Sequence, residues 1–129
     1  MKLLLILVLT PVVLIGLLQI FAVVQMQRKK GSAAPKVAGQ LGQAIASSKR
    51  SLIYFYSPSC GPCRRMAPTI DALQEQDDRV YKVDVSQTPE VAMQFGVMGT
   101  PAVVLVSNGV IDDIRMGFQP KDALVQLLA

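Results

Sequence analysis

The sequence predicts an α/β fold, a mixed central sheet flanked by helices, preceded by one N-terminal transmembrane helix. Short apolar runs rich in branched and aromatic residues alternate with segments in which apolar residues recur every three to four positions, which is the pattern of strands alternating with helices. The first thirty residues are instead almost continuously apolar. We therefore divide the 129 residues into an anchor with a basic flank (1–30), a short tether (31–36) and one folded domain (37–129).

The anchor is predicted from a stretch of 22 uncharged residues, Leu3–Val24, interrupted only by Thr10, Pro11, Gly16 and Gln19. A helix of that length is about 33 Å long, enough to cross a hydrocarbon core of about 30 Å. Pro11 lies in its first half, and lipid-embedded helices tolerate proline. We expect a single-pass anchor that contacts lipid through residues 3–24, in the inner membrane of a bacterium.

Two other interpretations of this stretch remain open. Met1-Lys2 resembles the start of a secretory signal, although the apolar run exceeds the usual length of about 7–15 residues and no A-x-A-like cleavage site follows it. A buried helix of a soluble protein is the third interpretation. Little else in the chain offers enough apolar surface to cover it on all sides.

The basic residues also bear on orientation. Lys2 and the terminal amine stand before the apolar stretch, whereas Arg28, Lys29, Lys30 and Lys36 follow it. The positive-inside rule therefore favours a cytoplasmic domain, by a margin of one or two charges.

The net charge of +4 comes entirely from the anchor's flanks, because residues 31–129 contain nine Lys plus Arg and nine Asp plus Glu. A neutral domain has no electrostatic footprint for nucleic acid. We expect no nucleic-acid partner.

The tether and the first two elements follow. Gly31–Pro35 reads G-S-A-A-P, a small and helix-breaking sequence that is typical of a linker. Apolar residues at helical spacing predict an amphipathic helix over Val37–Ser48. Ser51–Tyr56 (S-L-I-Y-F-Y) is short, branched and aromatic, and predicts a buried strand.

The middle of the domain continues the alternation. The stretch after S-P-S-C-G-P-C predicts a helix ending near Gln76, followed by an alternating strand over Val80–Val85. Pro89–Phe95 predicts a short helix, with proline at its first position.

The last third predicts a hairpin and a helix. Ala102–Val106 (A-V-V-L-V) is a buried strand, and Asn108-Gly109 is the strongest short-range signal for a hairpin turn into Val110–Met116. Lys121–Leu128 closes the chain as a helix.

The chemistry is predicted to lie at Cys60 and Cys63, which follow a buried strand at the start of a helix. Unpaired N–H groups and the positive end of the helix dipole favour a thiolate there, so we assign Cys60 as nucleophile. Cys63, one turn later, is placed to resolve a mixed disulfide. Gly61 and Pro62 support the site, since glycine lets a substrate approach the backbone and proline restricts the turn.

Other uses of the cysteine pair fit less well. A structural zinc site needs four ligands, and the chain offers two cysteines and no histidine. Haem attachment needs histidine after the second cysteine, where Arg64 stands. A disulfide between such near neighbours constrains little of the chain. We therefore expect no metal and no cofactor.

Four further features stand at fixed separations from the C-G-P-C tetrapeptide at residues 60–63. They are a proline in the same helix, a G-T-P tripeptide, an N-G pair and a late glycine: Pro68, Gly99-Thr100-Pro101, Asn108-Gly109 and Gly117. Together they resemble the thioredoxin family over Val37–Ala129, and the resemblance implies a thioredoxin-like fold.

The resemblance also implies how substrate is bound. Pro101 is expected to be cis and to lie against the cysteine pair, and the backbone of Thr100 to pair with an extended substrate segment. Gly99 and Met98 adjoin this loop, and Met98 offers an apolar docking surface. The alternatives are an ordinary turn proline at Pro101 and a packed core methionine at Met98.

Several positions depart from the family. Ser59 stands where a tryptophan usually precedes the first cysteine, and Tyr54 stands where the family has a buried acid. A phenol is a far weaker base near neutral pH than a carboxylate. Lys82 matches the lysine that accompanies that acid, and the family's first strand is missing or replaced by the tether.

These observations predict a thiol-disulfide oxidoreductase that reduces protein disulfides at the membrane surface through Cys60 and Cys63. Its electron donor would be a thioredoxin reductase if the domain is cytoplasmic, or a membrane electron carrier if it is outside. The alternative is a redox-linked binding or assembly module for cysteine-containing membrane or secreted proteins, as in cytochrome maturation, with little general turnover.

Overall fold

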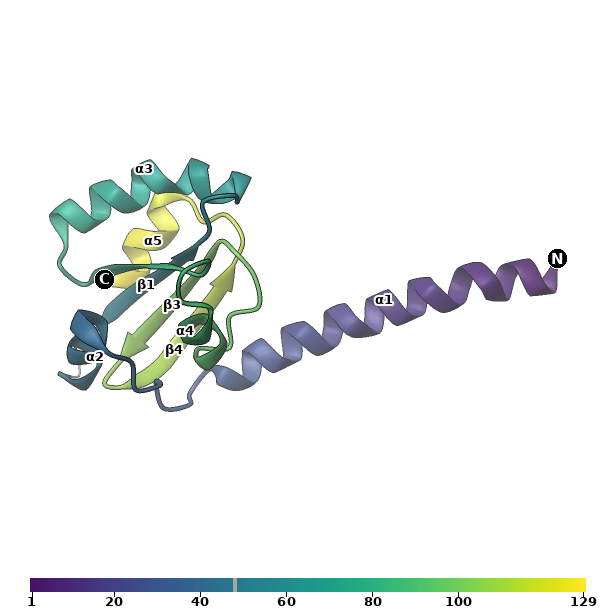
Figure 1. Cartoon of the computed structure of the whole chain (residues 1–129), viewed down its shortest axis with the longest axis horizontal. Helices are drawn as coiled ribbons and strands as arrows, with labels where there is room; N and C mark the ends of the chain where they lie inside the picture. The colour runs from purple at the N-terminus through teal and green to yellow at the C-terminus, as the bar shows by residue number, and fades with distance from the viewer. Residues whose placement is uncertain (48) are drawn as a thin grey trace.

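The computed structural model describes residues 1–47 and 49–129. A long helix, α1 (Lys2–Lys29), projects from a domain in which helices enclose a sheet (Figure 1). The elements of the domain are, in chain order, α2 (Gly39–Ala46), β1 (Ser51–Tyr56), α3 (Gly61–Gln76), β2 (Val80–Asp84), α4 (Pro89–Gln94), β3 (Ala102–Ser107), β4 (Val110–Met116) and α5 (Lys121–Leu128).

The order of elements is confirmed, with small differences at the ends. The first domain helix was predicted over Val37–Ser48, but Ala38 is extended (φ −80°, ψ 165°) and α2 begins at Gly39, whose φ of +78° suits glycine. Ser48 lies outside the described residues. The ends of β2, α4 and β3 differ from the prediction by one residue each.

The sheet is mixed, as predicted, with strand order β2-β1-β3-β4. β1 runs parallel to β2, while β3 is antiparallel to both β1 and β4. The start of β3 therefore lies beside the end of β1, where Ala102 faces Phe55. The loops that follow β1 and precede β3 thus meet at one end of the sheet.

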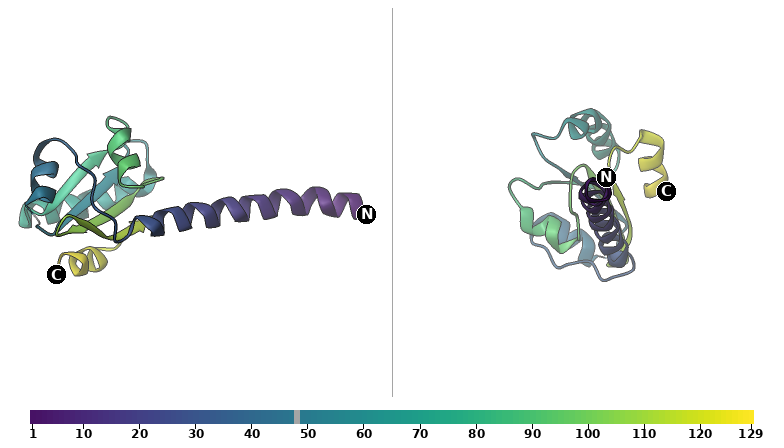
Figure 2. Two further views of the ribbon diagram at one scale, coloured as in Figure 1. Left: turned by 90° about the horizontal axis from the view of Figure 1, so that it is seen from below. Right: turned by 90° about the vertical axis from the view of Figure 1, so that its right-hand side faces the viewer.

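Helices cover both faces of the sheet (Figures 1 and 2). Alternate residues of β1 point to opposite faces. Ile53 and Phe55 pack into a core with α2 and α4, whereas Leu52 and Tyr54 pack into a second core with α3 and α5. Every residue of β1 except Tyr56 is buried, which explains why this strand is so apolar.

The Asn108-Gly109 hairpin is also confirmed. Both residues have positive φ, 53° and 72°, which a two-residue turn of this kind requires. The turn joins β3 to β4, and one irregularity in the pairing follows Leu105.

α1 is, among the described residues, the one helix long and apolar enough to cross a membrane. Its most apolar window has a mean hydropathy of 2.8 and is 0% buried inside the structure. Pro11 lies within the helix without ending it.

The segment expected to act as a tether is held on the domain. Gly31 donates its N–H to the carbonyl oxygen of Ile111 (2.7 Å), and the N–H of Ile111 donates to Ser32 (2.9 Å). Ala34 donates to Gly109 at 2.8 Å. These residues pair with the start of β4, so the chain enters the domain along one edge of the sheet, while β2 forms the opposite edge of the described sheet.

Candidate active site

Cys60 and Cys63 lie at the point where β1 gives way to α3. Cys60 is the N-cap of α3, and it forms a disulfide with Cys63 at a Cα–Cα separation of 5.2 Å. The backbone N–H of Cys63 donates to the Cys60 Sγ at 3.3 Å. The first turn of the helix therefore presents one backbone N–H group to this sulfur, a contact that favours a thiolate at a helix N-terminus.

The two cysteines differ in exposure. Cys60 is half-buried, whereas Cys63, in the first turn of α3, is 3% exposed. Gly61 and Pro62 between them are exposed. A β-carbon built on Gly61 meets no atom within 4 Å, so the surface beside Cys60 is open to an approaching molecule.

The G-T-P loop lies beside this site because β3 starts next to the end of β1. The peptide bond between Thr100 and Pro101 is cis, as the resemblance implies, and Pro101 is buried. Met98, Gly99 and Thr100 line a groove of about 550 Å³ together with Ser57 of the loop that carries Cys60. The structure thus brings the predicted substrate-binding loop and Ser57, three residues before Cys60, to one groove, which neither cysteine lines.

The groove has an apolar floor. Met98 is 62% exposed at its edge, so the alternative of a packed core methionine does not apply. Met93 of α4, 70% exposed, lines the same groove. Sequence reasoning missed Met93, since a methionine in a short amphipathic helix gives no signal of its own.

Tyr54 lies directly under the site. Its side chain is 2% exposed, and its hydroxyl donates to the carbonyl oxygen of Cys63 at 3.1 Å. Burial, and to a lesser degree the neighbouring Tyr56 and Asp71, raise the pKa of Tyr54 to about 12. The phenol therefore stays protonated near neutral pH and acts as a hydrogen-bond donor.

Lys82 has a partner that the sequence did not reveal. Its Nζ lies 2.7 Å from Asp71 Oδ1, on α3, and 5.8 Å from the centre of the Tyr56 ring. Tyr56 in turn stacks on Tyr54 at 5.5 Å. No local pattern could have predicted the pair of Lys82 and Asp71, because eleven positions and a turn of chain separate them.

Two arginines follow the cysteines. Arg64 donates to the carbonyl oxygen of Pro58 at 3.4 Å and so braces the loop before Cys60. Arg65 lies 5.3 Å from the centre of the Phe118 ring, a cation–π contact with the loop after β4. Phe118, 49% exposed, is a second residue near the site that the sequence did not indicate.

Metal ligation was not expected. The described residues contain no group of three or more His, Cys, Asp or Glu side chains able to hold a metal ion.

Comparisons with known proteins agree with this geometry. A family model described as Thioredoxin matches residues 34–129. Thioredoxin from Bacillus subtilis (strain 168) is 35% identical over 96 residues, covering 72% of this chain and 92% of the relative. Thioredoxin from Alicyclobacillus acidocaldarius is 39% identical over 90 residues, covering 67% of this chain and 86% of the relative.

Solved structures show the same likeness. A mutant thioredoxin from Halobacterium salinarum NRC-1 superposes with a TM-score of 0.61 at 35% identity, covering 76% of this chain and 93% of that structure. Thioredoxin from Fasciola hepatica gives a TM-score of 0.61 at 28% identity, covering 68% of this chain and 88% of that structure. The matched part is the domain, from the end of the predicted tether to the C-terminal helix.

Proposed function

The chain belongs to the thioredoxin family, and on that premise we propose that it reduces protein disulfides at a membrane surface through Cys60 and Cys63. Thiol-disulfide oxidoreductase chemistry follows from the family. The direction of the reaction, the roles of the residues and the membrane location are the proposal.

The difference in exposure between the two cysteines supports their roles best. Cys60 is half-buried at the helix N-terminus, while Cys63 is 3% exposed. In the reduced protein the Cys60 thiolate attacks one sulfur of the substrate disulfide, whose S–S bond breaks, and the departing sulfur takes up a proton. Cys60 is then joined to the substrate in a mixed disulfide.

Cys63 completes the reaction. It loses its proton and attacks the Cys60 Sγ, so that the mixed disulfide breaks and the second substrate sulfur leaves as a thiol. Two electrons pass from the protein to the substrate, and the protein is left with the Cys60–Cys63 disulfide, the form present in this structure. A thiol donor must reduce this bond before the next cycle.

Position 54, where a buried carboxylate could accept the proton of Cys63, is occupied by tyrosine. With a pKa of about 12, Tyr54 holds its own proton at neutral pH. Its hydroxyl instead donates a hydrogen bond of 3.1 Å to the backbone carbonyl oxygen of Cys63 and so holds that backbone in place. We therefore assign Tyr54 as a positioning residue and expect proton loss from Cys63 to go to water.

The groove beside Thr100 supports the binding of an extended peptide. We assign the backbone of Thr100 to pair with that peptide, and Gly99 and Met98 to contact its side chains. Pro101 holds the loop in place from its buried position. The exposed sulfurs of Met93 and Met98 suit varied apolar side chains, because methionine is flexible and polarisable.

The membrane location rests on α1. An uncovered helix of 28 residues with a basic end is suited to span a bilayer, with residues 3–24 against lipid. The electron donor is then a thioredoxin reductase on the cytoplasmic side or a membrane electron carrier on the other.

The second candidate function is a binding or assembly module with little turnover. Tyr54 favours it, because a site without a buried base at this position resolves mixed disulfides slowly. A long-lived mixed disulfide would hold a cysteine-containing partner in place.

Reduction of insulin by the full chain in detergent micelles tests the proposal. The protein should accelerate insulin reduction by dithiothreitol well above the rate of dithiothreitol alone, and both Cys60→Ser and Cys63→Ser should abolish the acceleration. Cys63→Ser should accumulate a mixed disulfide with insulin, while Cys60→Ser should not. A wild-type rate equal to that of dithiothreitol alone would overturn the reductase and leave the binding module.

A further inference from the structure

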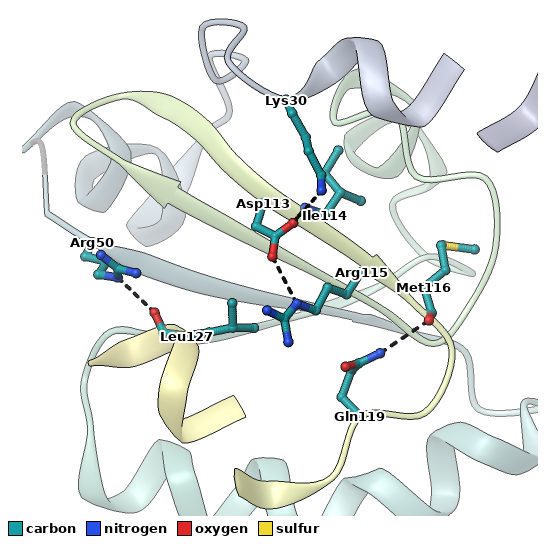
Figure 3. A network of polar contacts seen from close by, with 8 residues as sticks. All are labelled: Lys30, Arg50, Asp113, Ile114, Arg115, Met116, Gln119 and Leu127. Atoms are coloured by element: carbon teal, nitrogen blue, oxygen red, sulfur yellow. Dashed lines mark hydrogen bonds and ion pairs between the residues drawn. The ribbon is translucent and has the colours of Figure 1, made fainter. Parts of the chain in front are cut away.

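The orientation of the domain relative to α1 is fixed by contacts that follow the helix directly. Lys30 Nζ lies 2.8 Å from Asp113 Oδ1 on β4, and Asp113 also accepts a hydrogen bond from Arg115 at 2.9 Å (Figure 3). The next residues, Gly31 and Ser32, exchange backbone hydrogen bonds with Ile111. The residues that follow the helix directly are thus bonded to β4.

The last turns of α1 continue along the same strand. Val23, Gln27 and Lys30 line a cavity of about 160 Å³ together with Ile114 and Met116. Traced back toward its N-terminus, the helix therefore passes from the beginning of β4 toward the end of that strand. Met116 therefore lines the same cavity as Val23, and Val23 belongs to the uncharged stretch assigned to the membrane.

The end of β4 is the active-site end of the sheet. Met116 pairs with Ala102, the residue after Pro101. A β-carbon on Gly99 would lie 3.1 Å from the Met116 Cε, so Met116 touches the substrate-binding loop. α1 leaves the domain toward the side on which the arrowhead of β1 and the start of α3 lie (Figure 1).

The side chains at this end suit a lipid interface. Apolar groups exposed there are Met98 (62%), Met116 (41%) and Phe118 (49%). The exposed Arg64 and Arg65 accompany them. Exposed apolar side chains combined with arginine are typical of surfaces that bind the headgroup layer of anionic membranes.

We propose that the face bearing Cys60 is held against the lipid headgroups of the membrane that α1 spans, so that the protein reduces disulfides lying within that layer. This rests on the proposed function, because it assumes both the anchor and the reductase chemistry. Its substrates are then proteins of the same membrane whose disulfides lie close to the bilayer. A disulfide far above the surface would meet the opposite end of the domain.

The position of the face can be measured in nanodiscs containing anionic lipid. Both native cysteines of the full chain are first removed by Cys60→Ser and Cys63→Ser. A single new cysteine is then introduced, by Met98→Cys in one variant and by Asp78→Cys in another, and an environment-sensitive fluorophore is attached to that cysteine. Asp78 is exposed before β2, at the opposite end of the sheet. Lipids with a quencher in the headgroup region should quench the fluorophore at position 98 several-fold more strongly than at 78. Equal quenching would overturn the proposal.

Substrate choice gives the second readout. Two substrate peptides have identical transmembrane anchors, and each carries one disulfide. In the first a spacer of about 5 residues places the disulfide up to about 17 Å from the anchor, and in the second a flexible spacer of about 30 residues places it about 30 Å away. The wild type should reduce the near disulfide several-fold faster. Asp113→Lys, which places a cation opposite Lys30, should lose this preference, whereas the neighbouring Asp112→Lys should keep it.

Insulin, a soluble substrate, separates the two proposals. If the full chain in detergent micelles, where no bilayer covers the face bearing Cys60, does not reduce insulin, the proposed function fails. If it reduces insulin there but shows no preference for the near disulfide in nanodiscs, the reductase stands and the orientation toward the membrane is wrong. An Asp113→Lys protein that reduces insulin at the wild-type rate has kept its fold, so its loss of preference reports the orientation.

Discussion

The hydroxyl of Tyr54 donates a hydrogen bond of 3.1 Å to the carbonyl oxygen of Cys63, the more buried of the two cysteines. This contact joins β1 to the first turn of α3 at the centre of the site. Because the tyrosine is buried and its pKa is raised to about 12, it remains a donor over the whole physiological pH range.

Removing this hydroxyl should destabilise the domain. Tyr54→Phe loses one buried hydrogen bond, worth about 1 kcal/mol, which corresponds to a fall in Tm of about 4–8 °C for a domain of this size. Circular dichroism of the oxidised full chain in detergent measures it. Tyr56→Phe is the matched control, since Tyr56 is half-buried and its hydroxyl makes no hydrogen bond among the described residues, and equal falls in Tm would contradict the assignment.

The same tyrosine should titrate late. Absorbance at 295 nm should show a component with a midpoint near pH 12 that Tyr54→Phe removes. A pKa raised above the unfolded value of 10.0 stabilises the fold below pH 10, and that contribution is lost as pH rises from 10 to about 12. A spectrum unchanged by Tyr54→Phe near pH 12 would show that the phenol is not buried as described.

A carboxylate at position 54 should speed the second step of the reaction. Tyr54→Asp would place a base near Cys63, with burial raising the pKa of the new carboxyl. Resolution of the mixed disulfide at pH 7 should be about tenfold faster, a modest gain for general-base catalysis. Stopped-flow measurement of the rate at which a preformed mixed disulfide is resolved would show this gain. Tyr56→Asp, two residues further along β1, is the control and should give no gain.

The exposed methionine at the groove should matter for substrate and little for stability. Met98→Gln should raise KM for a protein disulfide several-fold, because the groove loses an apolar contact, while stability changes by less than about 0.5 kcal/mol. Insulin kinetics and a thermal melt measure the two. Val125→Gln, on α5 and 45% exposed, is the control that should leave KM unchanged.

The carboxylate of Asp113, which pairs with Lys30 directly after α1, should make the stability of the domain depend on pH in the acid range. Burial alone would raise the pKa of Asp113, but hydrogen bonds from Lys30 and Arg115 outweigh it and lower the pKa below the ordinary 3.8. A lowered pKa contributes stability above pH 3.8 that is lost as pH falls further.

Asp113→Asn should therefore cost less than about 1 kcal/mol at pH 7, because the ion pairs are partly exposed. The difference from wild type should shrink as pH falls below 3.8, as seen in thermal melts at pH 7 and at a pH below 3.8. A difference of the same size at both would mean that the charge is irrelevant.

Local patterns predicted the elements well because each depends on neighbours in sequence. Ser51–Tyr56 is apolar at every position that the two cores bury, and Asn108-Gly109 adopts the positive φ angles that these residues tolerate best. The predicted start of α2 was wrong by two residues. Val37 fits the apolar spacing of the helix, but the chain is still extended at Ala38 and the helix begins only at Gly39.

The contacts between distant segments were beyond such reasoning. Lys82 and Asp71 meet only because β2 lies beside α3, and Lys30 meets Asp113 only because the chain enters along β4. The C-G-P-C motif was enough to predict the cysteine pair, whereas the residues around the pair could be identified only from the fold. Met93 lines the groove, and Phe118 contacts Arg65. Both belong to segments whose distance in sequence from Cys60 gives no sign of their closeness to the site.

The pairing of residues 31–34 with β4 also bears on solubility. A strand at the border of a sheet carries unpaired backbone groups that invite other chains to add to it. Gly31, Ser32 and Ala34 occupy the beginning of this border at Gly109 and Ile111. Proteolysis after Lys36 would release the domain from α1 and uncover these groups at the same time, so the released domain would be prone to self-association and aggregation.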